Sequence, residues 1–383
     1  MTRIADVVEL TFGFAFKSAE FADGPDDVRL LRGDNVAQGN LKWAGAKRFP
    51  LDRVNEVDRY LLSPGDVVIA MDRPWIGAGL KYAVVRKHDL PSLLVQRVAR
   101  LRTKSDSLDQ GFLGVVIGSA AFTNYVIGVQ TGSAVPHISG GQIGDFEFTL
   151  PPIREQRAIA ATLGALDDKI ESNRRLIELI PSLVRARVDV AIADESVTIP
   201  VSDLATFTNG GAYTKGATGT GRMVIRIAEL NSGPGGSTVY NDIEVPDNKT
   251  ARAGDILMAW SGSLGVYRWY RDEAIINQHI FKVDPDGYPA WLVFDRLEAV
   301  MPVFRALAAD KATTMGHIQR GHLTSTTASL PTTAAIARLD EEIAPLWERL
   351  LLAERENQRL SRLRDALLPE LLSGRLRTPA EAS

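Results

Sequence analysis

Ser63-Pro64-Gly65-Asp66-Val67-Val68 is repeated in the second half of the chain as Arg252-Ala253-Gly254-Asp255-Ile256-Leu257. Each stretch is a Gly-Asp turn followed by an apolar run, which is typical of a buried strand that begins at a tight turn. The pair Leu150-Pro151 likewise returns as Leu330-Pro331, and a long charged segment follows each copy. A repeat this long predicts a duplicated domain rather than a solenoid. Two similar domains on one chain can read a target that has two similar halves.

Shorter echoes support the duplication. Val95-Gln96-Arg97-Val98 corresponds to Asn277-Gln278-His279-Ile280, and His137-Ile138 corresponds to His317-Ile318. The fold class expected is α+β, with two tandem mixed α/β domains and two long helices in the order domain, helix, domain, helix. The expected boundaries are 1–151 for the first domain, 152–193 for the first helix, 194–331 for the second domain, 332–376 for the second helix and 377–383 for a tail.

Both charged segments carry the apolar seam of a coiled coil, with residues three and four apart. The first seam is Leu163, Leu166, Ile170, Asn173, Ile177, Ile180 and Val184, and the second includes Ile343, Leu346, Leu350, Asn357 and Leu360. A whole domain separates the helices, so we expect an antiparallel pairing inside the molecule, in a pseudo-two-fold arrangement. The Asn in each seam either fixes the register or faces solvent at a local phase slip. Pro181 and Pro345 predict kinks or breaks.

Composition restricts the possible chemistry. The chain has 383 residues, a formal net charge of −3 and no Cys, so a disulfide framework, Cys-ligated zinc and a thiol nucleophile are excluded. We find no phosphate-binding loop, zinc-protease motif or nucleophile elbow. With no signal peptide and no apolar run of membrane length, a cytoplasmic protein is expected. His137 and His317 are interpreted as structural or contact residues rather than catalytic bases. These absences predict a binding protein rather than an enzyme. One alternative is an enzyme that acts alone and whose catalytic site has diverged beyond recognition.

Contacts to DNA require Arg, Lys, Ser or Asn for phosphates and Arg, Asn or Gln for base edges, usually on loops. The net charge of −3 argues weakly against a nucleic-acid partner. Two segments are nevertheless locally basic, Lys81–His88 and Gln96–Lys104, and the local field matters more than the total charge for contact with phosphates. The candidate DNA-binding residues are Lys17, Arg32, Asn35, Arg73, Trp75, Lys81 and Arg97 in the first domain, and Tyr213, Lys215, Arg226, Ser261, Ser263, Tyr267, Arg268 and His279 in the second. Arg32 and Arg226 occupy equivalent places, which fits a structural ion pair equally well.

Two stretches resemble a known family. Leu150–Ala160 reads LPPIREQRAIA and Leu163–Asn173 reads LGALDDKIESN. Together they closely resemble the central conserved region of the DNA specificity subunits of Type I restriction–modification systems. Leu339–Ile343 and Leu371–Leu376 resemble the family's distal conserved region. The second Leu-Pro departs from the first, since it lacks the Arg-Glu-Gln-Arg that follows Pro152-Ile153.

The resemblance implies a subunit without catalytic activity, cofactor or metal of its own. It would bind double-stranded DNA and assemble with two modification subunits, which carry S-adenosylmethionine and methylate adenine N6; whether restriction subunits join is left open. Each domain would read one half of a bipartite target, and the helices would fix the spacer and dock the modification subunits. The alternative from a different class is a non-DNA scaffold, with two ligand- or protein-binding domains on a coiled coil.

Overall fold

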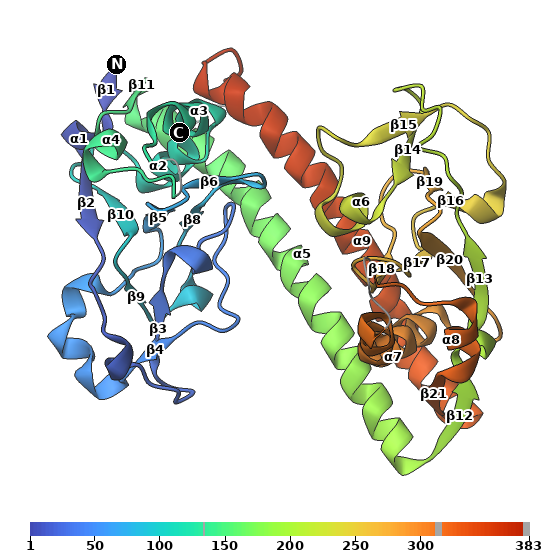
Figure 1. Cartoon of the computed structure of the whole chain (residues 1–383). Helices are drawn as coiled ribbons and strands as arrows, with labels where there is room; N and C mark the ends of the chain where they lie inside the picture. The colour runs from blue at the N-terminus through green and yellow to red at the C-terminus, as the bar shows by residue number, and fades with distance from the viewer. Residues whose placement is uncertain (133–134, 311–315, 378–383) are drawn as a thin grey trace. The chain divides into compact units, whose positions relative to one another are not determined.

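The computed structural model describes residues 1–132, 135–310 and 316–377 (Figure 1). It divides into two units: Met1–Asp168 with Leu360–Ser383, and Lys169–Arg359. Both long helices cross this division, so each unit contains a domain and a part of each helix. The tail expected at 377–383 lies outside the described residues beyond Arg377.

The first unit contains a four-stranded antiparallel sheet and a three-stranded sheet. The four-stranded sheet has the order β2 (Val8–Phe12), β10 (Val98–Thr103), β5 (Val67–Ala70), β8 (Tyr82–Val84). The second has the order β4 (Arg48–Phe49), β3 (Val28–Leu31), β9 (Ser92–Leu94), with β3 and β9 parallel. Two short pairs complete it, β1 (Thr2–Arg3) with β11 (Glu147–Phe148) and β6 (Trp75–Ile76) with β7 (Gly79–Leu80). Its helices are α1 (Ile4–Val7), α2 (Gln110–Ile117), α3 (Ala120–Val129) and α4 (Gly140–Gly144).

All four residues of strand β5 are buried. Successive side chains of a strand point to opposite faces, so β5 is covered on both sides. Val67 and Ile69 pack with Phe112 of α2 and Phe122 of α3. Val68 and Ala70 pack instead with apolar residues of the second sheet, Leu31 and Leu94 among them. The four-stranded sheet is therefore the middle layer, with α2 and α3 on one side and the smaller sheet on the other (Figure 1).

The second unit repeats this plan, and the predicted duplication is confirmed. Its antiparallel sheet has the order β13 (Ala205–Asn209), β20 (Ile280–Pro285), β17 (Ile256–Ala259), β18 (Gly265–Arg268). Its second sheet has the order β15 (Val239–Asn241), β14 (Arg222–Ile225), β19 (Ala274–Ile276), β16 (Thr250–Ala251), with β14 and β19 parallel. Strand β12 (Ser196–Pro200) pairs with β21 (Thr327–Pro331), and the helices are α6 (Ile227–Ser232), α7 (Ala290–Asp310) and α8 (Arg320–Ser325).

The burial pattern is also repeated. Ile256 and Met258 of β17 pack in the same cluster as residues of α7, whereas Leu257 packs with residues of the second sheet. The single helix α7, which contacts β18 and β21, thus covers the face that α2 and α3 cover in the first unit.

The long helices are α5 (Ile153–Asp194) and α9 (Thr333–Leu372). Pro181 does not interrupt α5, so the expectation of a break there is wrong. The second helix ends four residues before the expected 376 because Gly374 adopts a left-handed φ of 71° and its N–H donates to Leu371, a common helix ending.

Gln156 attaches the start of α5 to the first domain. It is 0% exposed. Its Oε1 accepts from the N–H of Asp109 at 2.8 Å, and its Nε2 donates to the carbonyls of Ser107 and Pro151 at 2.9 and 2.8 Å. Because Asp109 also caps α2, one side chain joins the two helix starts. This gives the Arg-Glu-Gln-Arg stretch a structural role.

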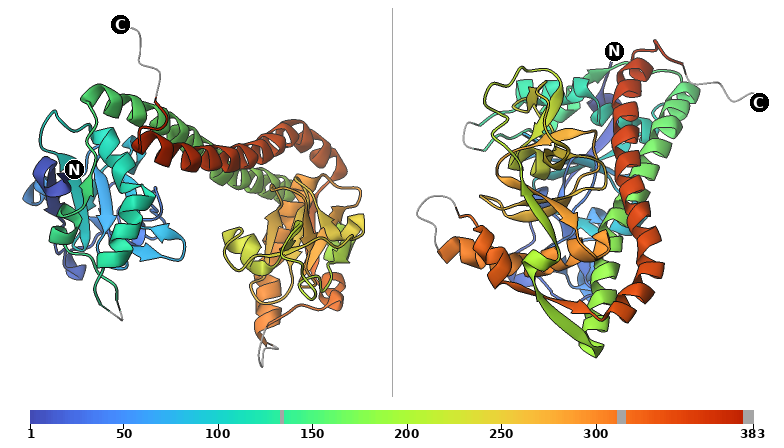
Figure 2. Two further views of the ribbon diagram at one scale, coloured as in Figure 1. Left: turned by 90° about the horizontal axis from the view of Figure 1, so that it is seen from above. Right: turned by 90° about the vertical axis from the view of Figure 1, so that its right-hand side faces the viewer.

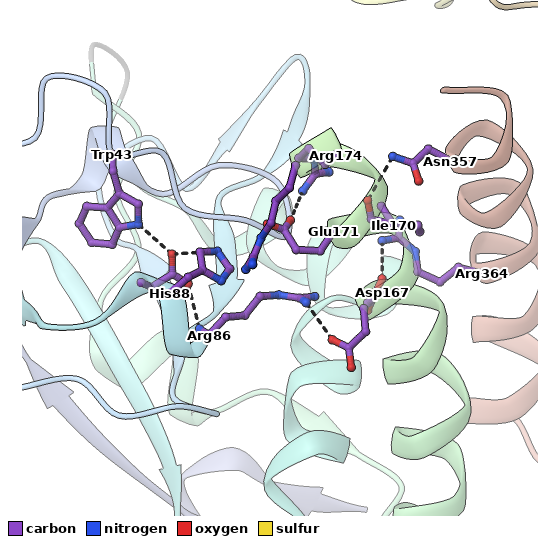
Figure 3. Close-up of polar contacts among 12 residues, drawn as sticks. Trp43, Arg86, His88, Asp167, Ile170, Glu171, Arg174, Asn357 and Arg364 are labelled. Carbon is purple, nitrogen blue, oxygen red and sulfur yellow. Dashed lines mark hydrogen bonds and ion pairs between the residues drawn. The ribbon is translucent and has the colours of Figure 1, made fainter. Parts of the chain in front are cut away.

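Within the second unit, α5 and α9 lie side by side and antiparallel (Figure 2). Arg187 pairs with Glu342 at 3.2 Å, whereas Asn173, nearer the start of α5, donates to Glu356 at 2.8 Å. Asn173 is fully buried, so the alternative that it faces solvent is wrong. Asn357 donates to the carbonyl of Ile170 at 3.1 Å (Figure 3).

The helices also meet within the first unit. Arg364 Nη1 donates to Asp167 Oδ1 at 3.1 Å (Figure 3). Leu371, which is 2% exposed, packs in the same cluster as Ile159 and Leu163. Of the predicted seam positions, Leu163, Ile170, Asn173, Ile180, Val184, Ile343 and Leu350 are buried, and Leu166, Ile177, Leu346, Asn357 and Leu360 are partly buried.

Among the described residues, no single helix has both the length and the apolar character needed to span a membrane; only α2 and α3 taken together, bent by 58°, pass that test.

Candidate nucleic-acid interface

Three segments of the first domain meet just beyond the end of β5. The N–H of Met71 donates to the carbonyl of Arg97 at 2.8 Å, and the N–H of Ile138 donates to Met71 at 2.9 Å. The N–H of Arg73 donates to the carbonyl of Pro136 at 2.6 Å. We call residues 71–73, 97 and 136–138 the first junction.

The second domain builds the same arrangement beyond β17. Trp260 N–H donates to His279 at 3.2 Å, Ile318 N–H donates to Trp260 at 3.0 Å, and Gly262 N–H donates to Gly316 at 2.9 Å. We call residues 260–262, 279 and 316–318 the second junction. The two junctions have the same pattern of backbone hydrogen bonds. The side chains that each presents can therefore differ without a change of fold.

The first junction presents charged side chains. Asp72 lies between two partners: its Oδ1 is 2.7 Å from Nδ1 of His137, and its Oδ2 is 3.7 Å from Nε of Arg97. The side chain of Arg97 is 61% exposed, and Arg73 is exposed as well. Trp75, on the neighbouring β6–β7 hairpin, is 38% exposed. This surface offers cationic donors beside an exposed aromatic ring.

The second junction presents rings and a hydroxyl instead. The ring centre of His279 lies 5.6 Å from that of Trp260, and the ring centre of His317 lies 6.5 Å from it. Ser261 stands where the first junction has Asp72, and Gly262 stands where it has Arg73. The repeated scaffold therefore carries two chemically different surfaces.

The predicted contact residues fall into three classes of exposure. Lys17, Arg32, Arg73, Trp75, Arg97, Lys215 and Ser263 are exposed; Tyr213, Arg226, Tyr267 and His279 are partly buried; Asn35, Lys81, Ser261 and Arg268 are buried. Only Arg73 and Arg97 in the first domain, and Ser261 and His279 in the second, belong to the junctions.

Three of the candidates have structural partners within the fold. Asn35 Oδ1 accepts from the N–H of Arg32, and its Nδ2 donates to the carbonyl of Lys42, so both ends of its amide are used. Arg226 makes a two-pronged pair with Glu229 at 2.6 and 3.0 Å. The equivalence of Arg32 and Arg226 thus marks a shared turn, in which each backbone N–H donates to a side chain three residues later.

Arg268 is the third candidate with a structural partner. Its side chain is 4% exposed, its Nη2 lies 2.8 Å from Glu354 of α9, and its guanidinium lies 4.4 Å from the ring centre of Trp347. Tyr267 donates its hydroxyl to Asn231 at 2.6 Å. Arg268 therefore joins the second domain to α9 within the second unit, and it is not available to a polynucleotide.

Lys81 is close to the first junction but buried. Burial lowers the pKa of its ammonium, Asp34 opposes that shift, and the charge of Arg73 adds to it. Sequence reasoning missed Asp72 as a member of the site, and it treated His137 and His317 only as structural or contact residues. The sequence does contain a signal for these residues, because the pair His-Ile occurs in both halves. In each half the Ile N–H makes one of the hydrogen bonds of the junction.

Comparison with known proteins gives these features a family context. Residues 1–182 match the family model described as Type I restriction modification DNA specificity domain. The specificity subunit of the Type I restriction enzyme EcoAI from Escherichia coli is 34% identical over 191 residues, which is 50% of this chain and 31% of that protein. The MjaVIII specificity subunit from Methanocaldococcus jannaschii is 32% identical over 180 residues, 47% of this chain and 42% of that protein. The matched region thus spans less than half the length of either relative.

A solved structure extends the likeness of fold to the whole chain. The S subunit of a Type I restriction–modification system from M. genitalium aligns with a TM-score of 0.62 at 12% sequence identity, covering 96% of this chain and 94% of that one. Residues 1–182 are thus similar to the Type I DNA specificity family, and the second unit repeats the sheet order of the first.

Proposed function

We propose that this chain is the sequence-specific DNA-recognition subunit of a Type I restriction–modification complex. The observation that carries the proposal is that a domain matching the DNA specificity family over residues 1–182 has a second copy of the same fold in the same chain. Each copy has a junction with the same backbone hydrogen bonds but different side chains. That combination suits a target with two unlike halves, one read by each domain.

The long helices suit the role of a spacer. In the second unit they are held in antiparallel register by Asn173 and by the Arg187–Glu342 pair. In the first unit Gln156 fixes the start of α5 to its domain. A helix attached to a domain at its start and paired along its length holds that domain in a defined position on the helix. We propose that these attachments set the distance between the two half-sites.

The chain would perform no bond-making step itself. We propose that two modification subunits dock on the complex, bind S-adenosylmethionine and methylate adenine N6, and that restriction subunits are a further, optional partner. We propose that the complex works in the cytoplasm. In this scheme the residues of this chain bind and orient DNA, and the partners supply the chemistry.

The test is to express the chain with its modification subunits in a methylation-free bacterial host and to sequence the methylated adenines. A single split motif with two defined halves is expected. DNA binding by the purified complex should weaken steeply with salt, and Lys215→Ala, at an exposed loop position, should weaken binding to all sequences and reduce the salt slope by about 1. Absence of both methylation and salt-dependent binding would favour the scaffold that does not bind DNA.

A further inference from the structure

We infer that the first junction reads a guanine through Arg97, with Arg73 as a second contact beside it, and that the second junction reads its half-site without an arginine. This inference rests on the proposed function and deepens it. It assigns the base-reading position of each domain and predicts how the two halves of the target differ.

Arg73 stands where the fold favours glycine. Its φ is 46°, and its equivalent in the second domain is Gly262, whose φ is 67°. Both make the same backbone hydrogen bond across their junction. A side chain in this left-handed region costs free energy that glycine avoids. The second domain shows that the junction forms with glycine, so the arginine is not needed to build it.

Arg97 also has a left-handed backbone conformation. Its φ is 68°, and in the part of the chain that the structure describes Arg73 and Arg97 are the non-glycine residues with positive φ. The two strained positions lie at one junction, joined through Met71 and Asp72. Strained backbone of this kind concentrates at functional sites, where a side chain must point in a set direction.

Asp72 decides what Arg97 is suited to contact. The carboxylate lies 3.7 Å from Nε of Arg97 and 2.7 Å from His137. A negative charge so close disfavours a phosphate at this place but not the neutral edge of a base. With Nε facing Asp72 and 61% of the side chain exposed, the terminal nitrogens suit the paired acceptors O6 and N7 of guanine, the commonest target of an arginine in the major groove. Asp72 is therefore a positioning residue.

The second junction lacks this chemistry among its described residues. His279 takes the place of Arg97, Ser261 that of Asp72 and Gly262 that of Arg73. His279 has a flat ring beside Trp260 and no fork of donors. The second half-site is therefore expected to have no arginine-read guanine at the matching position.

The experiment uses the full chain with its modification subunits and compares Arg97→Lys and Arg73→Gly with the wild type. Binding selection from a randomised duplex library and methylated-adenine sequencing give the motif. Arg97→Lys keeps the charge but loses the two-pronged geometry. It should relax one guanine position in one half, at a tenfold or greater loss of discrimination, with the salt slope unchanged.

Arg73→Gly separates binding from folding. It should leave the thermal midpoint equal or higher, since it removes strain, and should weaken DNA binding at least fivefold. The matched control, His279→Ala, should change only the other half of the motif. Guanine discrimination retained in Arg97→Lys, or unchanged affinity in Arg73→Gly, would overturn the inference while the wild-type motif still supports the proposed function. A wild-type complex without any motif would overturn the function itself.

Discussion

Asn173 Nδ2 donates to Glu356 Oε2 at 2.8 Å inside the second unit, from a side chain that is fully buried in an otherwise apolar seam. Lys169 lies 3.3 Å from the same carboxylate. The hydrogen bond from Asn173 is the main cause that lowers the pKa of Glu356, with burial opposing it. A buried amide that has one specific acceptor favours a single helix register over its neighbours.

Asn173→Ala should therefore destabilise the second unit, by about 1 kcal/mol for the lost hydrogen bond. Because the pKa of Glu356 is lowered on folding, its stabilising contribution is present above its unfolded pKa and is lost as the pH falls through the folded value. The deficit of the variant should accordingly shrink on acidification below about pH 4.3, the ordinary pKa of Glu. Denaturant unfolding at pH 7 and pH 3 measures this. Ser172→Ala, one residue away and exposed, is the control; an equal loss in both variants would contradict the assignment.

Leu350→Asp tests the apolar seam. Leu350 is 2% exposed and packs within the core cluster of the second unit, so an unpaired carboxylate there should cost several kcal/mol. Leu352→Asp, on the same helix but 55% exposed, introduces the same charge into solvent. Circular dichroism melts should show a large loss for the first variant and little change for the second. Equal stability of the two variants would mean that the seam is assigned to the wrong face.

The ion pair of Arg268 and Glu354 gives a pH-dependent prediction. Burial raises the pKa of Glu354, and Arg268 offsets part of that rise. Arg268→Met would leave a buried carboxylate without its partner, at a cost of about 3–5 kcal/mol near neutral pH. A carboxyl whose pKa is raised on folding opposes folding above its unfolded pKa and stops doing so once it is protonated. The deficit of the variant should therefore diminish as the pH falls.

The matched variant of that pair is Arg268→Met with Glu354→Leu, which removes both charges. Its stability should return close to that of the wild type, as for other buried pairs replaced by apolar residues. Thermal unfolding at pH 5 and pH 8 distinguishes the cases. A double variant as unstable as Arg268→Met would indicate that packing on Trp347, rather than the buried charge, carries the effect.

The duplication and the helices were predictable because their signals are local and periodic. The turn before Val67 recurs before Ile256, and both strands form with the expected burial. The role of Arg268 was not predictable, because its partner Glu354 is 86 residues away in the sequence and leaves no local pattern. The left-handed backbone at Arg73 was hidden for another reason: arginine is not a residue that marks a turn.

The last prediction concerns the spacing of the two half-sites. Both long helices pass from one unit to the other between Asp168 and Lys169 and between Arg359 and Leu360. One heptad inserted at each of these points keeps both seams in phase and lengthens each helix by roughly 10 Å, at about 1.5 Å per residue. If the helices set the spacing, the gap in the methylated motif should grow by at most about three base pairs, at roughly 3.4 Å each. Both half-site sequences should stay unchanged, because neither junction is altered. Inserting the heptad in α5 alone shifts its register against α9 and is the control, which should lose methylation. A motif whose gap is the same with and without the paired insertions would show that the spacing is set elsewhere in the complex.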